Sequence, residues 1–224
     1  MKVPTVLCLH AGASGPATWR ELAGRLAQHG FRTVTPTLLG HHDAPRRSHY
    51  RLADFADHVL ADTASSLPEH FAVVGNSMGA FVGSVVAQRV PERITALVLE
   101  EMPVPRRTSA DTRPIARRSA GWAMRALAPL GRRRFDPAML RSVLDELGTP
   151  MPWWWQELDR LTMPTLLIGG GRRSHLDQRR FDLVADRIPD ARQHTIEAGH
   201  RVHSRQPGRH GDLVVPFLRE HART

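Results

Sequence analysis

The chain has 224 residues, of which 41% are hydrophobic and 24% are charged, a composition typical of one globular domain with a single core. No stretch approaches the roughly 20 consecutive apolar residues of a membrane span, and the first residues lack the charged head and cleavage site of a signal peptide. We therefore expect a cytoplasmic protein with no membrane partner. Because Cys8 is the single cysteine, an internal disulfide is excluded.

The net charge of +9 comes almost wholly from arginine, because Lys2 is the only lysine among 31 basic residues. Residues 103–152 contain ten arginines and four acidic residues. A basic surface attracts nucleic acids, but no zinc-finger or RNA-binding motif accompanies these arginines, so we expect no nucleic-acid partner. Two explanations stay open: the arginines bind an anionic group of a substrate, or they reflect a compositional bias that replaces lysine by arginine.

Short β-branched and aliphatic runs alternate with amphipathic stretches along the chain, the pattern of a parallel sheet flanked by helices. Most of the predicted strands are apolar on both faces, as buried parallel strands are. These strands cover residues 3–9, 32–35, 71–74, 95–99, 164–168 and 193–196. The helices predicted between them cover residues 17–29, 51–66, 78–89, 176–187 and 208–221.

One segment interrupts this alternation. Residues 102–163 are rich in Pro, Arg and Trp, contain no convincing strand, and are too many for a simple connection. We predict an α/β fold with a core of residues 1–101 and 164–224, into which residues 102–163 are inserted as a small helical lid. Where this insertion returns to the core, we expect Trp153-Trp154-Trp155 to anchor it, with at least one indole near the pocket.

A serine lies between the third strand and the following helix, in the turn Gly75-Asn76-Ser77-Met78-Gly79. Glycines two residues before and after a serine let strand and helix approach closely while the serine Oγ projects from a tight turn. The helix N-terminus and the Met78 N–H group would stabilise negative charge that develops beside the hydroxyl. The pattern predicts Ser77 as a nucleophile.

With this elbow in its strand-turn-helix setting, the chain resembles the α/β-hydrolase superfamily, and serine esterases in particular, over essentially its whole length. Residues 9–15 are similar to the His-Gly segment that completes the oxyanion hole of that family, with Ala11 where glycine is usual. The resemblance implies that the N–H groups of Gly12 and Met78 form this hole. It also implies a reduced, six-stranded parallel sheet in the order 2-1-3-4-5-6, without the first two strands of the family.

The loop after the last predicted strand carries Gly199-His200, which resembles the Gly-His loop of the same family. The resemblance implies that His200 takes the proton of Ser77 and later returns it to the leaving group. We expect structural roles for His10 and His203.

The catalytic triad of this family consists of the serine, the histidine and an acid. Here the position of the acid departs from the usual pattern. In most members it follows the strand that here covers residues 164–168, but residues 169–174 contain no carboxylate. The preceding strand ends in two glutamates. This segment resembles the one that haloalkane dehalogenases have before their catalytic glutamate, and Glu101 stands at the position of that glutamate. Glu100 and Asp177 stay open as alternatives; because strand side chains alternate, Glu100 and Glu101 cannot both face His200.

The resemblance implies a serine hydrolase that cleaves a carboxylic ester or a related acyl bond of a small molecule, without cofactor or metal. Haloalkane dehalogenases use aspartate at the elbow, so Ser77 disfavours dehalogenation. Alternatives with the same triad are a thioesterase, a lactonase, a C–C bond hydrolase or an acyltransferase. A different alternative is a non-catalytic ligand-binding protein on a hydrolase scaffold. The sequence leaves the oligomeric state open.

Overall fold

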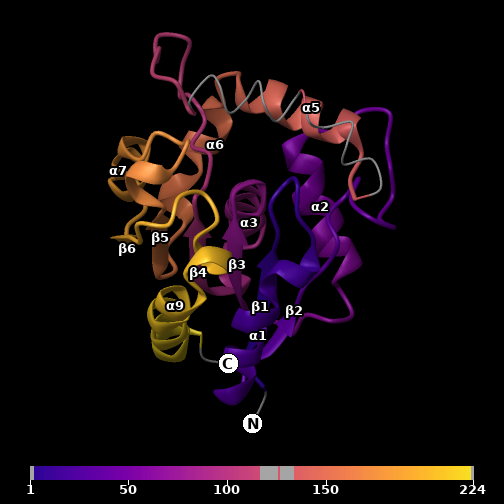
Figure 1. Ribbon diagram of the computed structural model, residues 1–224, viewed down its shortest axis with the longest axis vertical. Helices are drawn as coiled ribbons and strands as arrows, with labels where there is room; N and C mark the ends of the chain where they lie inside the picture. The colour runs from indigo at the N-terminus through magenta and orange to yellow at the C-terminus, as the bar shows by residue number, and fades with distance from the viewer. Residues whose placement is uncertain (1–2, 117–125, 127–133, 223–224) are drawn as a thin grey trace.

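A six-stranded sheet forms the centre of the computed structural model, which describes residues 3–116, 126 and 134–222 (Figure 1). Its strands lie in the order β2-β1-β3-β4-β5-β6, and each pair of neighbours is parallel. The strands are β1 (Thr5–Leu9), β2 (Arg32–Val34), β3 (Phe71–Asn76), β4 (Ile94–Glu100), β5 (Thr165–Gly169) and β6 (Ala191–Thr195). The predicted fold class and strand order are confirmed.

Helices cover both faces of the sheet. One face carries α1 (Arg20–Gln28) and α9 (Pro207–His221), and the other carries α2 (Leu52–Asp62), α3 (Met78–Arg89) and α7 (Arg179–Ala185). Strand side chains alternate between these layers, so that Val6 and Cys8 pack toward α1 and α9 while Leu7 and Leu9 pack on the α3 side. The two layers give the sheet an apolar core on each side.

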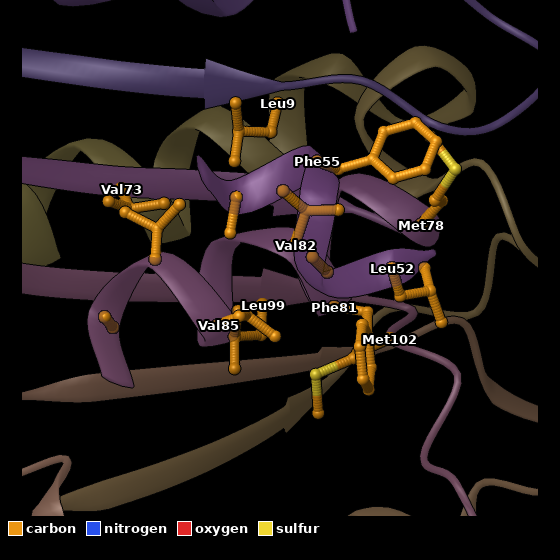
Figure 2. Packing of buried hydrophobic residues seen from close by; sticks show 14 of the residues in the cluster. Leu9, Leu52, Phe55, Val73, Met78, Phe81, Val82, Val85, Leu99 and Met102 are labelled. Atoms are coloured by element: carbon orange, nitrogen blue, oxygen red, sulfur yellow. The ribbon is translucent and has the colours of Figure 1, made fainter. Parts of the chain in front are cut away.

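The central helix α3 is buried on nearly every side. Figure 2 shows Phe81, Val82 and Val85 of this helix among Leu9 and Leu99 of the strands. A helix that is apolar all round is typical of such a central position. Because α3 is enclosed, its N-terminus is held rigidly at the end of β3.

The chain between β4 and β5 contains α5 (Pro137–Leu147), α6 (Pro152–Gln156) and a 3₁₀ turn (Leu158–Arg160). Figure 1 shows α5 at the top of the molecule, between α6 and one end of α2. The Glu146 carboxylate of α5 accepts a hydrogen bond of 2.6 Å from the Leu52 N–H group, at the start of α2. The arginines at 117, 118, 125, 132 and 133 lie outside the described residues.

Two sets of contacts fasten this segment to the core. The buried Arg180 of α7 donates hydrogen bonds to the carbonyl oxygens of Val104 and Pro105, at 2.9 and 2.8 Å. At the other end, the buried Trp154 donates from Nε1 to Ser84 Oγ at 2.9 Å and stacks on Phe81 with 5.5 Å between ring centroids. The tryptophan run therefore contains an anchor, as expected.

Candidate active site

Ser77 occupies a strained turn between β3 and α3. Its backbone has φ of 53° and ψ of −121°, which L-residues rarely adopt. A Cβ atom added at Gly75 would collide with the carbonyl oxygen of Gly79, and one added at Gly79 would collide with that of Leu9. The two glycines of the predicted elbow therefore allow strand and helix to pack closely enough for this turn.

A chain of hydrogen bonds joins Ser77, His200 and Glu101. The Nε2 atom of His200 lies 2.8 Å from Ser77 Oγ, and its Nδ1 atom lies 3.0 Å from Glu101 Oε2. Ser77 follows β3, Glu101 follows β4, and His200 lies in the loop after β6, so the carboxyl ends of parallel strands bring them together. The structure unites the three residues singled out from the sequence.

The Glu101 carboxylate is fully buried and well supplied with donors. Besides His200, it accepts hydrogen bonds from the Gly170 N–H group and the Ser174 hydroxyl. Burial raises the pKa of Glu101, but the hydrogen bonds from His200, Ser174 and Gly170 outweigh it and bring the pKa below its ordinary value. An ionised Glu101 requires a proton on Nδ1 of His200, which leaves Nε2 free to accept from Ser77.

The two alternative acids lie elsewhere. Glu100 points away from Glu101 and bonds to His203 Nδ1 at 2.9 Å. Asp177 forms an ion pair of 3.0 Å with Arg179 near the start of α7. Within the described residues, neither carboxylate is hydrogen-bonded to His200. As expected, only one of the two adjacent glutamates, Glu101, faces His200.

The sequence pattern did not indicate Ser174 and Gly170 as partners of the acid. Both belong to the loop after β5, where the sequence pattern has no carboxylate. The absence of a carboxylate from this loop was the available sequence signal, because some other group had to occupy the space beside His200. His175 was also missed; its ring centroid lies 4.1 Å from that of His200.

Gly12 and Met78 border the same pocket as Ser77 and His200. In the part of the chain that the structure describes, neither N–H group donates a backbone hydrogen bond. The carbonyl oxygen of Gly12 lies 2.9 Å from Nε2 of the buried His41, which holds this loop in place. His10 is also buried and accepts at Nε2 from the Leu38 N–H group at 3.2 Å, a structural contact.

The pocket has a volume of about 380 Å³. One wall consists of apolar side chains spaced along one face of α5, namely Leu140, Val143, Leu144 and Leu147. Arg106, Thr112, Arg113 and His175 contribute polar groups. None of Trp153, Trp154 and Trp155 is among its described lining residues.

Among residues 3–116, 126 and 134–222, no group of three or more His, Cys, Asp or Glu residues could hold a metal ion. No helix in these ranges is long and apolar enough to span a membrane.

Comparisons with known proteins bear on the fold and the family of the chain. The sequence model of a family described as alpha/beta hydrolase fold matches residues 4–139. The chain is 29% identical over 231 residues to a pimeloyl-[acyl-carrier protein] methyl ester esterase of Aromatoleum aromaticum, covering 86% of this chain and 88% of the relative.

Solved structures show the same fold. An esterase from Exiguobacterium antarcticum superimposes with a TM-score of 0.82 at 15% identity, covering 96% of this chain and 92% of that one. An enol-lactonase from Burkholderia xenovorans LB400 superimposes with a TM-score of 0.79 at 16% identity, covering 98% and 92%.

Proposed function

The chain belongs to the alpha/beta hydrolase fold family, and from that premise we propose that it is a serine hydrolase that cleaves a carboxylic ester or a related acyl bond through an acyl-enzyme. The observation that carries this proposal is the unbroken hydrogen-bonded chain from Ser77 through His200 to Glu101 beside an apolar pocket. Each group has the chemistry that its role requires.

In the first half of the reaction, Ser77 Oγ attacks the acyl carbon while its proton passes to His200 Nε2 over 2.8 Å. Glu101 orients the imidazole through Nδ1 and stabilises the imidazolium that forms, without taking the proton itself. The N–H groups of Gly12 and Met78 donate to the oxyanion of the tetrahedral intermediate. The bond to the leaving group then breaks, and His200 returns the proton to that group.

In the second half, His200 takes a proton from a water molecule whose oxygen attacks the acyl carbon of the Ser77 ester. The second tetrahedral intermediate collapses, the acid product leaves, and Ser77 recovers its proton from His200.

We further propose that residues 102–163 form a lid that binds the acyl part of the substrate. The apolar face of α5 suits an aliphatic chain, and Arg113, which is exposed beside the pocket, suits an anionic group at the end of that chain. Arg106 is already engaged, because its guanidinium donates to the Gly148 carbonyl oxygen.

Ester cleavage is favoured over the other acyl reactions because the relative from Aromatoleum aromaticum is itself a methyl ester esterase at 29% identity. A thioesterase, lactonase, C–C hydrolase or acyltransferase would use the same groups. A substrate panel of esters, thioesters and lactones with matched acyl parts separates these activities.

Labelling with a fluorophosphonate tests the catalytic role of the serine. We expect stoichiometric labelling of the wild type, none of Ser77→Ala, and labelling slowed at least a hundredfold in His200→Ala. A wild type that is not labelled, or labelling unaffected by His200→Ala, would indicate a non-catalytic binding protein.

The acid is tested by comparing Glu101→Gln with Asp177→Asn. We expect the first to lower kcat by roughly 10² to 10⁴, because it leaves the imidazolium without a counter-charge, and the second to change kcat less than twofold. A fully active Glu101→Gln enzyme rejects Glu101 as the acid.

The anionic substrate is tested with two esters that differ only in a carboxylate at the end of the acyl chain. We expect a KM for the anionic ester that is about tenfold lower at low salt, and loss of that difference in Arg113→Gln. Arg209→Gln, on α9, is the control with the same change in net charge. Equal KM values for both esters would leave compositional bias as the explanation of the arginines.

A further inference from the structure

A second buried glutamate, Glu100, precedes the proposed acid in the chain but has different hydrogen-bond partners. Its Oε1 atom accepts from the N–H groups of Val202 and His203, at 2.8 and 3.2 Å, at the start of α8 (Val202–Arg205). The same atom accepts from Asn76 Nδ2 at 2.9 Å. Its other oxygen, Oε2, lies 2.9 Å from His203 Nδ1 and 3.3 Å from His210 Nε2.

These contacts reach every segment that carries a residue of the proposed triad. Asn76 directly precedes the nucleophile, Glu100 directly precedes the acid, and Val202 lies two residues after the base. Asn76 Nδ2 also lies 3.3 Å from the carbonyl oxygen of His200, and the Ser77 N–H group donates to the Glu100 carbonyl oxygen at 2.9 Å. One side chain thus fastens the elbow to the histidine loop.

The surroundings of Glu100 keep it ionised although it is fully buried. Burial raises the pKa of this carboxyl, but His203 and His210 together outweigh that effect and bring the pKa down to about 2. His203 is held in turn by Trp19, which stacks on it at 4.4 Å, and by Thr18 Oγ1 at 2.7 Å from its Nε2 atom.

A buried charge lowers stability unless all its hydrogen bonds are supplied, and an apolar side chain would serve the core at least as well. The neighbouring β4 residues, Leu97, Val98 and Leu99, are apolar and buried. The hydrogen-bond donors of Glu100 come from the nucleophile elbow and from the segment that follows the base, and His210 of α9 lies 3.3 Å from its Oε2 atom. This distribution points to a role in the site.

We infer that Glu100 is a positioning residue that holds the loop of His200 at hydrogen-bonding distance from Ser77. The inference rests on the proposed serine hydrolase function. Loss of this anchor would let the imidazole move relative to the hydroxyl, and displacements of about 1 Å between reacting groups lower rates by up to a hundredfold.

The test uses Glu100→Gln and Asn76→Ala, with Gln88→Leu as a control at a buried polar residue near the far end of α3. End-point labelling with a fluorophosphonate counts folded active sites, and kcat and KM for an ester substrate are then expressed per labelled site. This normalisation removes any effect of fewer folded molecules.

We expect Glu100→Gln to lower kcat per labelled site by roughly tenfold to a hundredfold with KM changed less than twofold. Asn76→Ala, which removes the link to the His200 carbonyl oxygen, should cause a smaller loss of kcat, and Gln88→Leu should cause none. If Glu100→Gln yields no folded protein, Asn76→Ala decides the question alone.

Unchanged kcat per labelled site in the folded variants would overturn the inference and leave Glu100 as a stabilising residue. A wild type that is not labelled at Ser77 would instead refute the proposed function, so the two failures are distinguishable.

Discussion

The two consecutive glutamates at the end of β4 lie in different environments because the backbone changes conformation between them. Glu100 is the last strand residue, whereas Glu101 has a positive φ of 49°. This turn directs Glu101 toward His200 while Glu100 faces the opposite side. Positive φ values at non-glycine residues are strained and cluster at functional sites, which gives Glu101 support that is independent of its contacts.

The spacing of the glycines around Ser77 predicted the nucleophile, and the family resemblance implied His200 and the preferred acid, but neither revealed what holds the acid. Ser174 and Gly170 contact Glu101 only because the loop after β5 folds against the end of β4. Such an approach of two loops is a property of tertiary structure, and its only local trace is the absence of a carboxylate from residues 169–174.

The position of Ser174 predicts that the acid can be moved from the end of β4 to the loop after β5. Its hydroxyl contacts the same Glu101 oxygen as His200 does, so a carboxylate at residue 174 would lie close to the imidazole. We expect Glu101→Gln combined with Ser174→Asp to recover at least tenfold of the kcat lost in Glu101→Gln alone. Steady-state kinetics on an ester substrate measure this recovery.

The control for this exchange is Glu101→Gln combined with Ser174→Asn, which has a similar shape but no charge. Recovery in both double variants, or in neither, would show that a carboxylate at 174 does not replace the original acid.

At the level of elements, the hydrophobic pattern predicted the type of the six described strands and of α1, α2, α3, α7 and α9, while the ends of these elements were less certain. The second helix was expected to reach residue 66, but α2 ends at Asp62, and the Thr63 hydroxyl bonds back to the Val59 carbonyl oxygen. The start of α5 had a signal in the sequence, since Asp136 caps the Ala138 N–H group at 2.9 Å and Pro137 follows it. The placement of α5 over the pocket depends on long-range packing and could not be predicted.

Substitutions in the tryptophan run test the anchor of the segment between β4 and β5. Trp154→Ala should lower the free energy of unfolding by about 3 to 5 kcal/mol, because it leaves a cavity against Phe81 and removes the hydrogen bond to Ser84. Trp153→Ala, at a side chain that is partly exposed, should change it by less than about 1 kcal/mol. Urea unfolding followed by circular dichroism measures the free energy of unfolding of both variants. Equal losses would contradict the assignment of Trp154 rather than Trp153 as the anchor.

For the whole molecule, the positions of the arginines say more about their roles than the net charge does. Arg180 is buried and structural, Arg25 pairs with Asp212 on the surface, and Arg113 borders the pocket. The composition predicted a basic protein but could not assign these separate tasks, because each depends on which side chains the fold brings together.

Buried histidines make the stability of the whole molecule sensitive to acid. Burial, together with the smaller effect of the nearby His41, lowers the pKa of His10 from 6.5 to about 3. Below pH 6.5 the unfolded chain therefore binds a proton that the folded chain rejects, and stability falls as the pH drops from 6.5 toward 3. The contribution of His10 to this loss should be about 2 kcal/mol between pH 8 and pH 5.

His10→Gln retains a donor and an acceptor at this site but does not titrate. We expect its free energy of unfolding, from urea titrations at pH 8 and pH 5, to fall by about 2 kcal/mol less than that of the wild type. Parallel falls for both proteins would show that His10 is not the group responsible.

The left-handed backbone of Ser77 implies a trade-off between thermodynamic stability and reactivity. Such a conformation costs about 1 to 3 kcal/mol at a residue with a Cβ atom, and glycine avoids this strain at an entropic cost of about 0.5 to 1 kcal/mol. Ser77→Gly and Ser77→Ala both lack the hydroxyl, so their difference isolates the backbone. We expect Ser77→Gly to be the more stable by about 1 kcal/mol in urea unfolding, and equal stabilities would mean that the turn is relaxed. The residue proposed to perform the chemistry is thus one that selection for folding alone would replace.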